Sequence, residues 1–574
     1  MALTSVSPHE LQKQARTKVE NFRAALKSQA AFKAYIQTED SEEGGSWSWT
    51  NEDLLPTPLH NRTWRARNYI FFYSSLAMDN WTLGSSLIGV GLNWWQAIIS
   101  ILIAQIIGAS ASAFNSRCAE KYHVGFPIVA RATFGMYGAF YAVGARAVLA
   151  LIYYSLKLYV GSSFMVNMLH AVFGTGFTSI PNGLPESVGF TTQQMLAFFL
   201  FWLCHIPFAF FRPNQLKWLF TLKMCMMIPA MCGLFIFCMV NTHGKIGAGH
   251  LTSAIPTTST AWLFMYAINS SIGGHSTLIT NQPDYSRWAR KPWSSVWTQL
   301  IFWPISVTIS ASFGILSTAA INNVWGLKLW NQWDLLTAIL ERYPSSGARF
   351  AVFLCALFWA VLVLGTNVAA NMIPLGSDCA MLLPRYMNMI RGQVLGLVLS
   401  WAICPWQIYK SAATFTKFLS GYGLFMGGLT GIMVADYFLS RGNLFLGHLY
   451  DGEKSNPAYY YIKGWNVQAY IAYICGFAIG IGGFAGNLGA SVTSRTSEVG
   501  YLGWIMSFSV SMIVYTFLCL LWPTQSQRLV KSLRLRWEEK APLEVDTGLS
   551  DESSVEAGQV IEIANEGSKG VKSG

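Results

Sequence analysis

Long apolar runs separated by short polar loops dominate the chain between residues 68 and 522. A run of about 20 apolar residues is long enough for an α-helix to cross the hydrocarbon core of a bilayer. The pattern therefore predicts an all-α, polytopic membrane protein rather than a set of soluble domains. The twelve predicted spans cover residues 68–91, 94–114, 137–166, 193–211, 217–241, 259–279, 295–321, 350–373, 392–408, 411–438, 467–489 and 501–522.

Two polar tails flank this predicted core of residues 68–522. The N-terminal tail, residues 1–67, has mixed charge and no cleavable signal, so we expect the first span to direct its own insertion. Trp47, Trp49 and the stretch 54–56 are expected to dock against the membrane body. The C-terminal tail, residues 523–574, ends in a stretch rich in Gly, Ser and Glu that is typical of disorder. We expect the tails to serve regulation, as sites for trafficking or ubiquitination machinery.

Composition supports the membrane interpretation. Hydrophobic residues make up 52% of the chain and charged residues only 12%, against about 25% charged in ordinary soluble domains. The net charge of +11 would suit a nucleic-acid partner, but the basic residues lie in short clusters between apolar runs. We therefore expect the bilayer as partner, and no nucleic acid.

The basic residues in the loops predict the orientation, because cytoplasmic loops carry an excess of Lys and Arg. An even number of spans places both termini on one side. That side is predicted to be the cytoplasm, because the loops after even-numbered spans hold thirteen basic residues and the opposite loops hold six, namely Lys245, Lys328, Arg342, Arg349, Lys410 and Arg495. The expected location is the plasma membrane.

No enzyme chemistry is recognisable in the sequence. A GxSxG elbow, an HExxH helix and a glycine-rich phosphate loop are all absent. The ten cysteines lie mostly in apolar runs without metal-ligand spacing. We expect no cofactor, no metal and no catalytic residue.

Polar residues interrupt the first and sixth spans. The first span carries Asp79, Asn80 and Thr82, and the sixth carries adjacent glycines followed by His275. Buried polar groups in a span are costly and mark functional sites. Two broken spans five positions apart indicate inverted repeats with a substrate site at the midplane. Simple glycine-mediated helix packing is the alternative.

Three further spans carry candidate residues. Tyr153 and Lys157 in the third span are four residues apart and therefore share one helix face, although a lysine snorkelling to the interface is the alternative. Lys223 in the fifth span could also snorkel, or act as a proton-linked switch. Thr366 and Asn371 lie in the eighth span, where an amide can both donate to and accept from a heterocycle.

Eight ordered motifs resemble the nucleobase:cation symporter family one, and within it the fungal Fur-type permeases for uracil, allantoin, uridine and related vitamins. They are DLLPTPLHNRTW, SSLIGVGLNW, RATFG, NQPDYSR, GTNVAAN, LLPRYMNMIRG, CPW and GIMVADYFLSRGNL. The resemblance implies a five-plus-five inverted repeat, LeuT-like, with two extra helices. It also implies a substrate pocket formed by the first, third, sixth and eighth spans.

The resemblance assigns roles to individual residues. Asn371 matches the family's asparagine, and Lys223 matches a lysine of the Fur-type group. Tyr153 stands where the family usually has Trp, and Lys157 where it has Gln. His275 stands at a position that is often Phe or Tyr, and Asp79 at one that is commonly uncharged.

The resemblance also bears on ion coupling. Sodium-coupled relatives use a Ser-Thr pair on the eighth span; here Thr366 is present, but Gly365 replaces the serine. Proton coupling therefore fits better than sodium coupling, with Asp79, His275 and the region of Lys223 as carriers.

We expect Asp79 and Lys157 to pair across the empty cavity, because either charge alone would be costly there. An unpaired Lys157 would favour an anionic substrate, and an unpaired Asp79 a cationic vitamin such as thiamine or nicotinamide riboside. The predicted function is proton-coupled uptake of a nucleobase-related heterocycle by alternating access. A vitamin permease and a non-transporting nutrient sensor are the alternatives.

Overall fold

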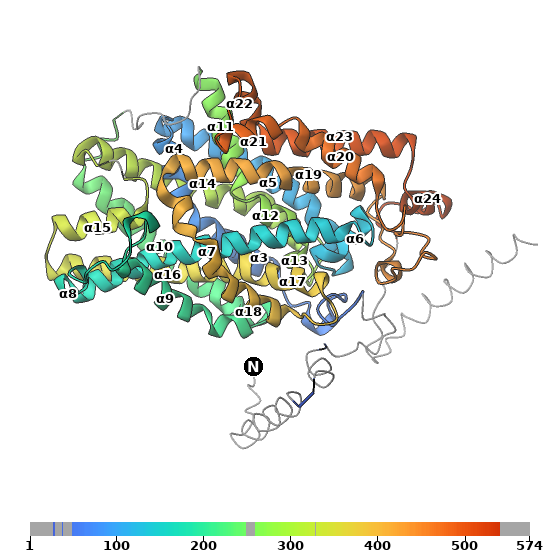
Figure 1. Cartoon of the computed structure of the whole chain (residues 1–574), viewed down its shortest axis with the longest axis horizontal. Helices are drawn as coiled ribbons and strands as arrows, with labels where there is room; N and C mark the ends of the chain where they lie inside the picture. The colour runs from blue at the N-terminus through green and yellow to red at the C-terminus, as the bar shows by residue number, and fades with distance from the viewer. Residues whose placement is uncertain (1–26, 29–36, 38–48, 248–258, 328, 540–574) are drawn as a thin grey trace, which may run out of the picture.

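The computed structural model describes residues 27–28, 37, 49–247, 259–327 and 329–539, and these form a bundle of α-helices (Figure 1). Within the described residues there is no sheet, and the two isolated bridges join Trp64 to Ala289 and Ile462 to Trp465. The predicted all-α fold class is confirmed. Some predictions from the sequence concern residues outside the described ranges, namely Trp47, Lys328 and the stretch 541–574.

A helix or a broken helix occupies each of the twelve predicted ranges. In chain order these are α3 (Ala66–Ala77) with α4 (Trp81–Gly89), α5 (Trp94–Tyr122), α7 (Ala139–Phe173), α9 (Thr192–His205), α10 (Lys217–Asn241), α11 (Thr260–Gly273) with α12 (Ser276–Thr280), α14 (Ser294–Trp325), α16 (Ser346–Asn367) with α17 (Ile373–Leu382), α18 (Met389–Leu399), α19 (Ala412–Leu439), α20 (Val467–Ala478) with α21 (Ile481–Asn487), and α23 (Gly503–Leu521). Shorter helices connect or follow them: α6 (Phe126–Phe134), α8 (Thr175–Thr178), α13 (Pro283–Ser286), α15 (Gln332–Arg342), α22 (Ser494–Gly500) and α24 (Gln525–Ser532).

Not every predicted span is a long continuous helix. Among the described residues, eight helices are long and apolar enough to cross a membrane, or up to nine if the pair α20 and α21, bent by 50°, counts as one span. The helices of the first and sixth spans are too short to cross a membrane because each span is broken. The helix of the ninth span, α18, is too short because it has 11 residues. The count of twelve spans therefore stays a prediction.

The packing of the helices repeats with a shift of five spans. α3 and α4 pack against α14, as their counterpart α11 packs against α5. α9 packs against α7 as α18 packs against α17, and α10 packs against α3 as α19 packs against α11. Because five is an odd number, equivalent spans cross the membrane in opposite directions. This is the arrangement of an inverted repeat.

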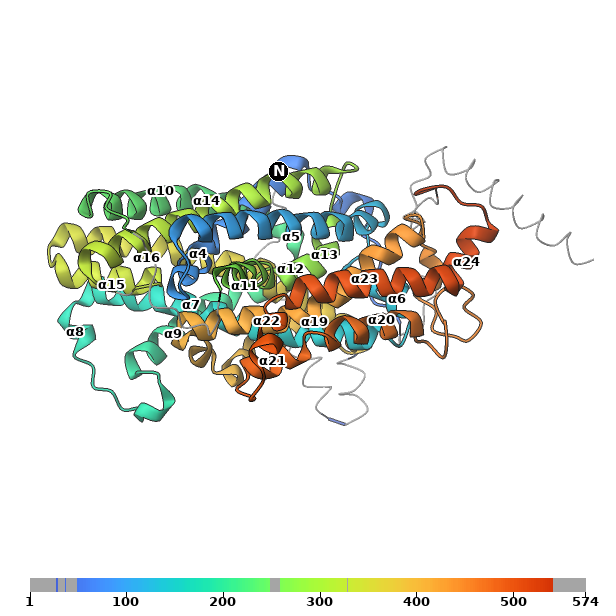
Figure 2. The same ribbon diagram turned by 90° about the horizontal axis from the view of Figure 1, so that it is seen from above.

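The connections gather at two opposite ends of the bundle. α6 and α24 lie at one end, whereas α8 and α15 lie at the other, in both views (Figures 1 and 2). The chain before α3 packs on the end that carries α6, where Arg131 donates to the backbone oxygen of Trp49 over 2.8 Å and Arg287 donates to that of Leu55 over 2.6 Å. Trp49 and Leu55 therefore dock on the membrane body, as the sequence predicts.

Glycines allow two helix backbones to approach each other beside the first break. A Cβ atom on Gly84 of α4 would collide with the backbone oxygen of Ala311 in α14, and one on Gly314 would collide with that of Trp81. Small residues at such crossings permit close packing of membrane helices. The crossing fixes α4 against α14 directly after the break.

Candidate substrate-binding site

The first span breaks at the residues that the sequence singles out. Met78–Asn80 form one 3₁₀ turn between α3 and α4, and Asp79 has a non-helical φ of −84° and ψ of 22°. The freed backbone oxygens are satisfied by side chains, because Ser310 donates to that of Met78 and Asn80 donates to that of Ala77, each over 2.8 Å. Irregular backbone at membrane depth is tolerated where such partners exist or where it lines a cavity.

The sixth span breaks between α11 and α12. His275 separates the two helices with a φ of −115° and a ψ of 1°, and Gly273 lies so close to the backbone oxygen of Leu419 that no side chain would fit. The hydroxyl of Tyr422 in α19 donates to the oxygen of Gly273, which the break leaves free. Both predicted breaks are therefore present.

A polar cavity of about 90 Å³ lies between the two breaks. Its walls come from the first, third, sixth, eighth and tenth spans and from the loop before α19. All five predicted substrate residues and Thr366 contribute to them. The lining residues include Asp79, Tyr153, Lys157, His275, Thr366, Asn371 and Tyr409.

Asp79 and Lys157 form an ion pair across this cavity. The Lys157 Nζ lies 2.5 Å from the Asp79 Oδ2, and the two side chains are 21% and 5% exposed. Charged hydrogen bonds of this length are roughly twice as strong as neutral ones. The pairing expected from the sequence is present, and it leaves the two charges of the cavity neutralised by each other.

Tyr153 forms an aromatic wall of the cavity. Its hydroxyl donates to that of Tyr422, which in turn bonds the oxygen of Gly273, so the third, tenth and sixth spans share one hydrogen-bond chain. The Tyr153 ring also packs against Phe418, with ring centroids 5.7 Å apart. With its hydroxyl engaged, Tyr153 offers the cavity mainly its ring.

Asn371 lies in a π-helical turn, Val368–Met372, in the middle of the eighth span. Pro374 lies two residues after this turn and has no N–H with which to bond the preceding turn, which favours such a distortion. The hydroxyl of Tyr285 donates to the backbone oxygen of Ala369. Asn371 Nδ2 donates to Asn367 Oδ1 over 2.9 Å, and within the described residues its Oδ1 accepts no hydrogen bond.

His275 projects from the break in the sixth span. Its Nδ1 donates to the backbone oxygen of Ser271 over 3.2 Å, and its ring lies edge-on to Trp303, with centroids 5.6 Å apart. With Nδ1 carrying this proton, Nε2 of the neutral ring is left as an acceptor. His275 can therefore accept a hydrogen bond from a substrate.

Lys223 does not snorkel to the membrane surface. Its side chain is fully buried, and its Nζ donates to the Thr366 Oγ1 over 2.9 Å. A Cβ atom at Gly365 would lie 2.8 Å from the Lys223 Cδ. The lysine therefore fills the space beside Thr366 that a larger residue at position 365 would need.

A buried ion network on the α6 side of the cavity was missed by sequence reasoning as a unit. Arg146 of α7 pairs with Asp378 of α17, lies 4.0 Å from Asp284 and donates to the backbone oxygen of Pro374 over 2.8 Å. The sequence did offer a signal for Asp378, because an acidic residue directly after the apolar run of the eighth span is unusual. Tyr409, which lines the cavity from the loop before α19, gave none, because it lies outside the predicted broken spans.

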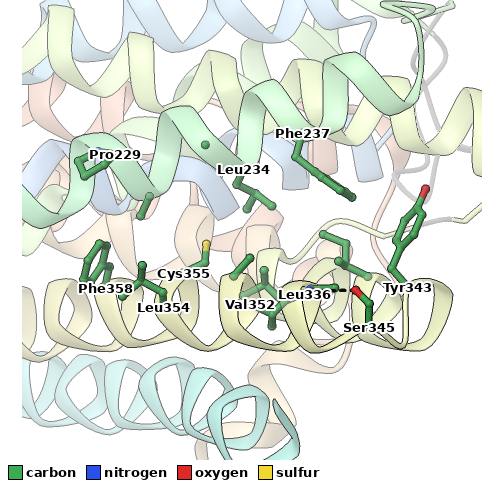
Figure 3. Close-up of a pocket in the computed structure, with 15 residues that line it drawn as sticks. Pro229, Leu234, Phe237, Leu336, Tyr343, Ser345, Val352, Leu354, Cys355 and Phe358 are labelled. Atoms are coloured by element: carbon green, nitrogen blue, oxygen red, sulfur yellow. Dashed lines mark hydrogen bonds between the residues drawn. The ribbon is translucent and has the colours of Figure 1, made fainter. Parts of the chain in front are cut away.

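A second, larger cavity is a poorer candidate. It has a volume of about 540 Å³ and lies between α10 and α16, with Pro229, Leu234 and Phe237 facing Val352 and Phe358 (Figure 3). Among the described residues, none of those that line it is charged. A largely apolar cavity of this kind cannot satisfy the ring nitrogens and carbonyl oxygens of a polar heterocycle.

Two broken spans that enclose a small polar cavity inside an inverted repeat define a secondary transporter. Residues 56–507 match the sequence profile of the family described as "Permease for cytosine/purines, uracil, thiamine, allantoin". The chain belongs to this family, whose members are permeases and not enzymes.

Named relatives agree with this assignment. The chain is 34% identical to the allantoin permease of Saccharomyces cerevisiae over 484 residues, which cover 82% of this chain and 76% of that one. It is 34% identical to the uridine permease of the same yeast over 480 residues, which cover 82% and 75%.

A solved structure shares the fold. Mhp1, a nucleobase-cation-symport-1 family transporter in a closed conformation with bromovinylhydantoin bound, matches with a TM-score of 0.62 and 18% identity, over 85% of this chain and 97% of that chain. At this identity the likeness supports the fold alone.

Proposed function

We propose that the protein takes up a neutral nucleobase-related heterocycle, such as uracil, allantoin or uridine, together with protons. The ion pair between Asp79 and Lys157 carries the proposal. Because the two charges neutralise each other, the cavity favours a polar but uncharged ring. Relatives named for allantoin and uridine support the same substrate class.

The side chains around the cavity suit such a ring. The Tyr153 ring offers a stacking surface, the Asn371 amide a donor and acceptor edge, and His275 Nε2 an acceptor. A ring N–H and a ring carbonyl can replace the partners that Asp79 and Lys157 now find in each other. The cavity of about 90 Å³ is smaller than typical ligand pockets of roughly 300–1,000 Å³, so binding requires it to widen.

Proton coupling is the finer part of the proposal. Sodium needs a shell of oxygen ligands, and Gly365 supplies no hydroxyl beside Thr366. The Lys223 ammonium already bonds the Thr366 hydroxyl, and while it is protonated it repels a second cation. Asp79, His275 and Lys223 are the proposed proton carriers, because each is ionisable and lies in or beside the cavity.

A vitamin permease is the second candidate, because the family description includes thiamine. A cationic ring would have to displace Lys157 from Asp79 and leave the ammonium without its partner, which is costly in a buried site. A nutrient sensor is the third candidate, and it would bind its ligand without concentrating it. The plasma membrane as location, cytoplasmic termini, and trafficking or ubiquitination machinery at the tails, 1–67 and 523–574, remain proposals that follow from the loop charges and tail composition.

A competitive-uptake panel tests the substrate proposal in cells that lack their own permeases. Uracil, uridine, allantoin, uric acid, thiamine and nicotinamide riboside compete with a labelled substrate in acidic and neutral medium. We expect a neutral heterocycle to be taken up, faster in acidic medium and without sodium. Uptake restricted to the cationic vitamins, or driven by sodium and indifferent to pH, would contradict the proposal.

A double variant tests the cavity itself. Lys157→Gln with Tyr153→Trp restores the residues usual in the family and should shift the substrate profile toward that of ordinary uracil and allantoin carriers. Lys410→Gln, an exposed lysine outside the cavity, is the matched control and should leave the profile unchanged. An unaltered profile in the double variant would count against this cavity as the substrate site.

A further inference from the structure

The segment after α24 returns to the bundle and inserts one carboxylate between two spans. The Glu538 carboxylate receives two parallel hydrogen bonds from Arg117 near the end of α5, with Nε 2.8 Å from Oε1 and Nη2 2.6 Å from Oε2. Both side chains are largely buried, at 12% and 8% exposure. Bidentate pairs of this geometry are among the stronger hydrogen-bonded contacts in proteins.

A second helix holds the same carboxylate. The Tyr437 hydroxyl, near the end of α19, donates to the Glu538 Oε1 over 2.8 Å. The Glu538 N–H donates to the backbone oxygen of Arg441 over 2.8 Å, and Lys121 Nζ donates to the Glu538 backbone oxygen. Trp537 packs edge-on against the Tyr437 ring, with centroids 5.3 Å apart. Glu538 therefore bridges α5 and α19.

Arg117 extends the cluster to a third span. Its guanidinium lies 4.0 Å from the ring centre of Trp293, which precedes α14, and 3.3 Å from the Glu120 carboxylate. Glu120 accepts the Ser295 N–H of α14 over 2.9 Å. Arg117 and Lys121 balance Glu120 and Glu538, so removing the Glu538 charge leaves a partly buried site with excess positive charge.

We propose that Arg117, Lys121 and Tyr437 form a carboxylate-binding site for the chain's own C-terminal segment, and that Glu538 acts there as a latch. The latch fastens α5 and α14 to α19 at the end of the bundle that carries α6. It holds this end closed, and its release favours the state open toward this end. This role rests on the proposed alternating access, in which one group of helices moves against another.

Cys118 provides a direct reporter of the latch. It follows Arg117, is 6% exposed, and lines a small cavity between α5 and α19 together with Tyr437. In detergent-purified full-length protein with the other nine cysteines replaced, we expect Glu538→Gln to speed maleimide modification of Cys118 roughly tenfold or more, the factor for losing one charge-assisted hydrogen bond. Glu539→Gln should leave the rate unchanged, because within the described part of the chain the Glu539 carboxylate accepts a hydrogen bond from the backbone N–H of Arg536 alone.

A double-variant cycle separates the latch from a general loosening of the fold. Arg117→Gln should speed Cys118 modification as Glu538→Gln does, and the combined variant should add little to either one. Additive effects, or an unchanged rate in Glu538→Gln, would overturn the latch. Because the Cys118 modification experiment measures no transport, it tests the latch even if the proposed substrate class is wrong.

Uptake measurements test whether release of the latch changes transport. Ending the chain after Glu539 keeps the latch, whereas ending it after Leu533 removes it. Because α6 follows the second span, the end that carries it is predicted to face the cytoplasm. At equal surface amounts, we expect the shorter chain and Glu538→Gln to raise the apparent KM for uptake about threefold or more, because release of the latch leaves fewer molecules in the outward-facing state. An unchanged KM together with faster Cys118 modification would reduce Glu538 to a static anchor and overturn its role in transport.

Discussion

At the scale of single residues, the proposed substrate class depends on the charge pair of the cavity. Lys157 and Asp79 lie on different spans, and the sequence could only pose their pairing as a hypothesis. The structure brings the two charged atoms to 2.5 Å. The two charges therefore balance each other, and on this balance we base the proposal of a neutral ring rather than a charged vitamin.

Neutralising one partner should harm the protein more than neutralising both. Asp79→Asn or Lys157→Gln alone leaves an uncompensated charge, and breaking a buried pair costs about 3–5 kcal/mol, with the lower end expected here because Lys157 is partly exposed. Thermal unfolding of the purified protein should show lower midpoints for the single variants and partial recovery in the double variant. A double variant as unstable as the sum of the singles would show that the pair is not coupled.

Gly365 supplies a second test at this scale. Gly365→Ser restores the hydroxyl of sodium-coupled relatives but places its Cβ 2.8 Å from the Lys223 side chain. We expect this variant to lose uptake at least severalfold, and Gly365→Ser with Lys223→Ala to regain uptake and to respond to sodium. If Gly365→Ser transports normally, Lys223 does not fill that space.

At the scale of elements, hydropathy predicted where helices lie along the chain better than where they end. α5 continues to Tyr122 although its apolar run ends near residue 114, because a helix does not stop where the bilayer stops. α6 and α15 were not predicted, since their apolar faces pack on other helices and do not span the membrane. The breaks at Asp79 and His275 were predictable, because polar residues and glycines announce them directly.

The glycines that let α4 and α14 touch should be intolerant of a methyl group. Gly84→Ala or Gly314→Ala forces two backbones apart, and overpacking of this kind costs about 1–3 kcal/mol. Gly233→Ala in α10, where nothing lies within 4 Å of the added Cβ, is the matched control and should be neutral or slightly stabilising. Thermal unfolding of the three variants in detergent checks the ranking, and equal midpoints would contradict the close crossing.

At the scale of the whole molecule, the sequence predicted the fold class, the two broken spans and the pairing of Asp79 with Lys157, but not the ion contacts outside the cavity. Arg146 with Asp378, and Arg117 with Glu538, join positions hundreds of residues apart. Periodicity reports which face of a helix is apolar, not which distant helix that face meets. Such pairs become visible only when the spans are assembled.

We propose that the protein concentrates a neutral heterocycle by using the proton gradient. The most direct measurement is uptake of labelled uracil, uridine or allantoin by sodium-free proteoliposomes with an acidic exterior. We expect at least one of them to accumulate above its external concentration and to leak back when a protonophore is added. Accumulation that requires sodium, or binding that never exceeds equilibrium in a protein otherwise shown to be folded, would contradict the account.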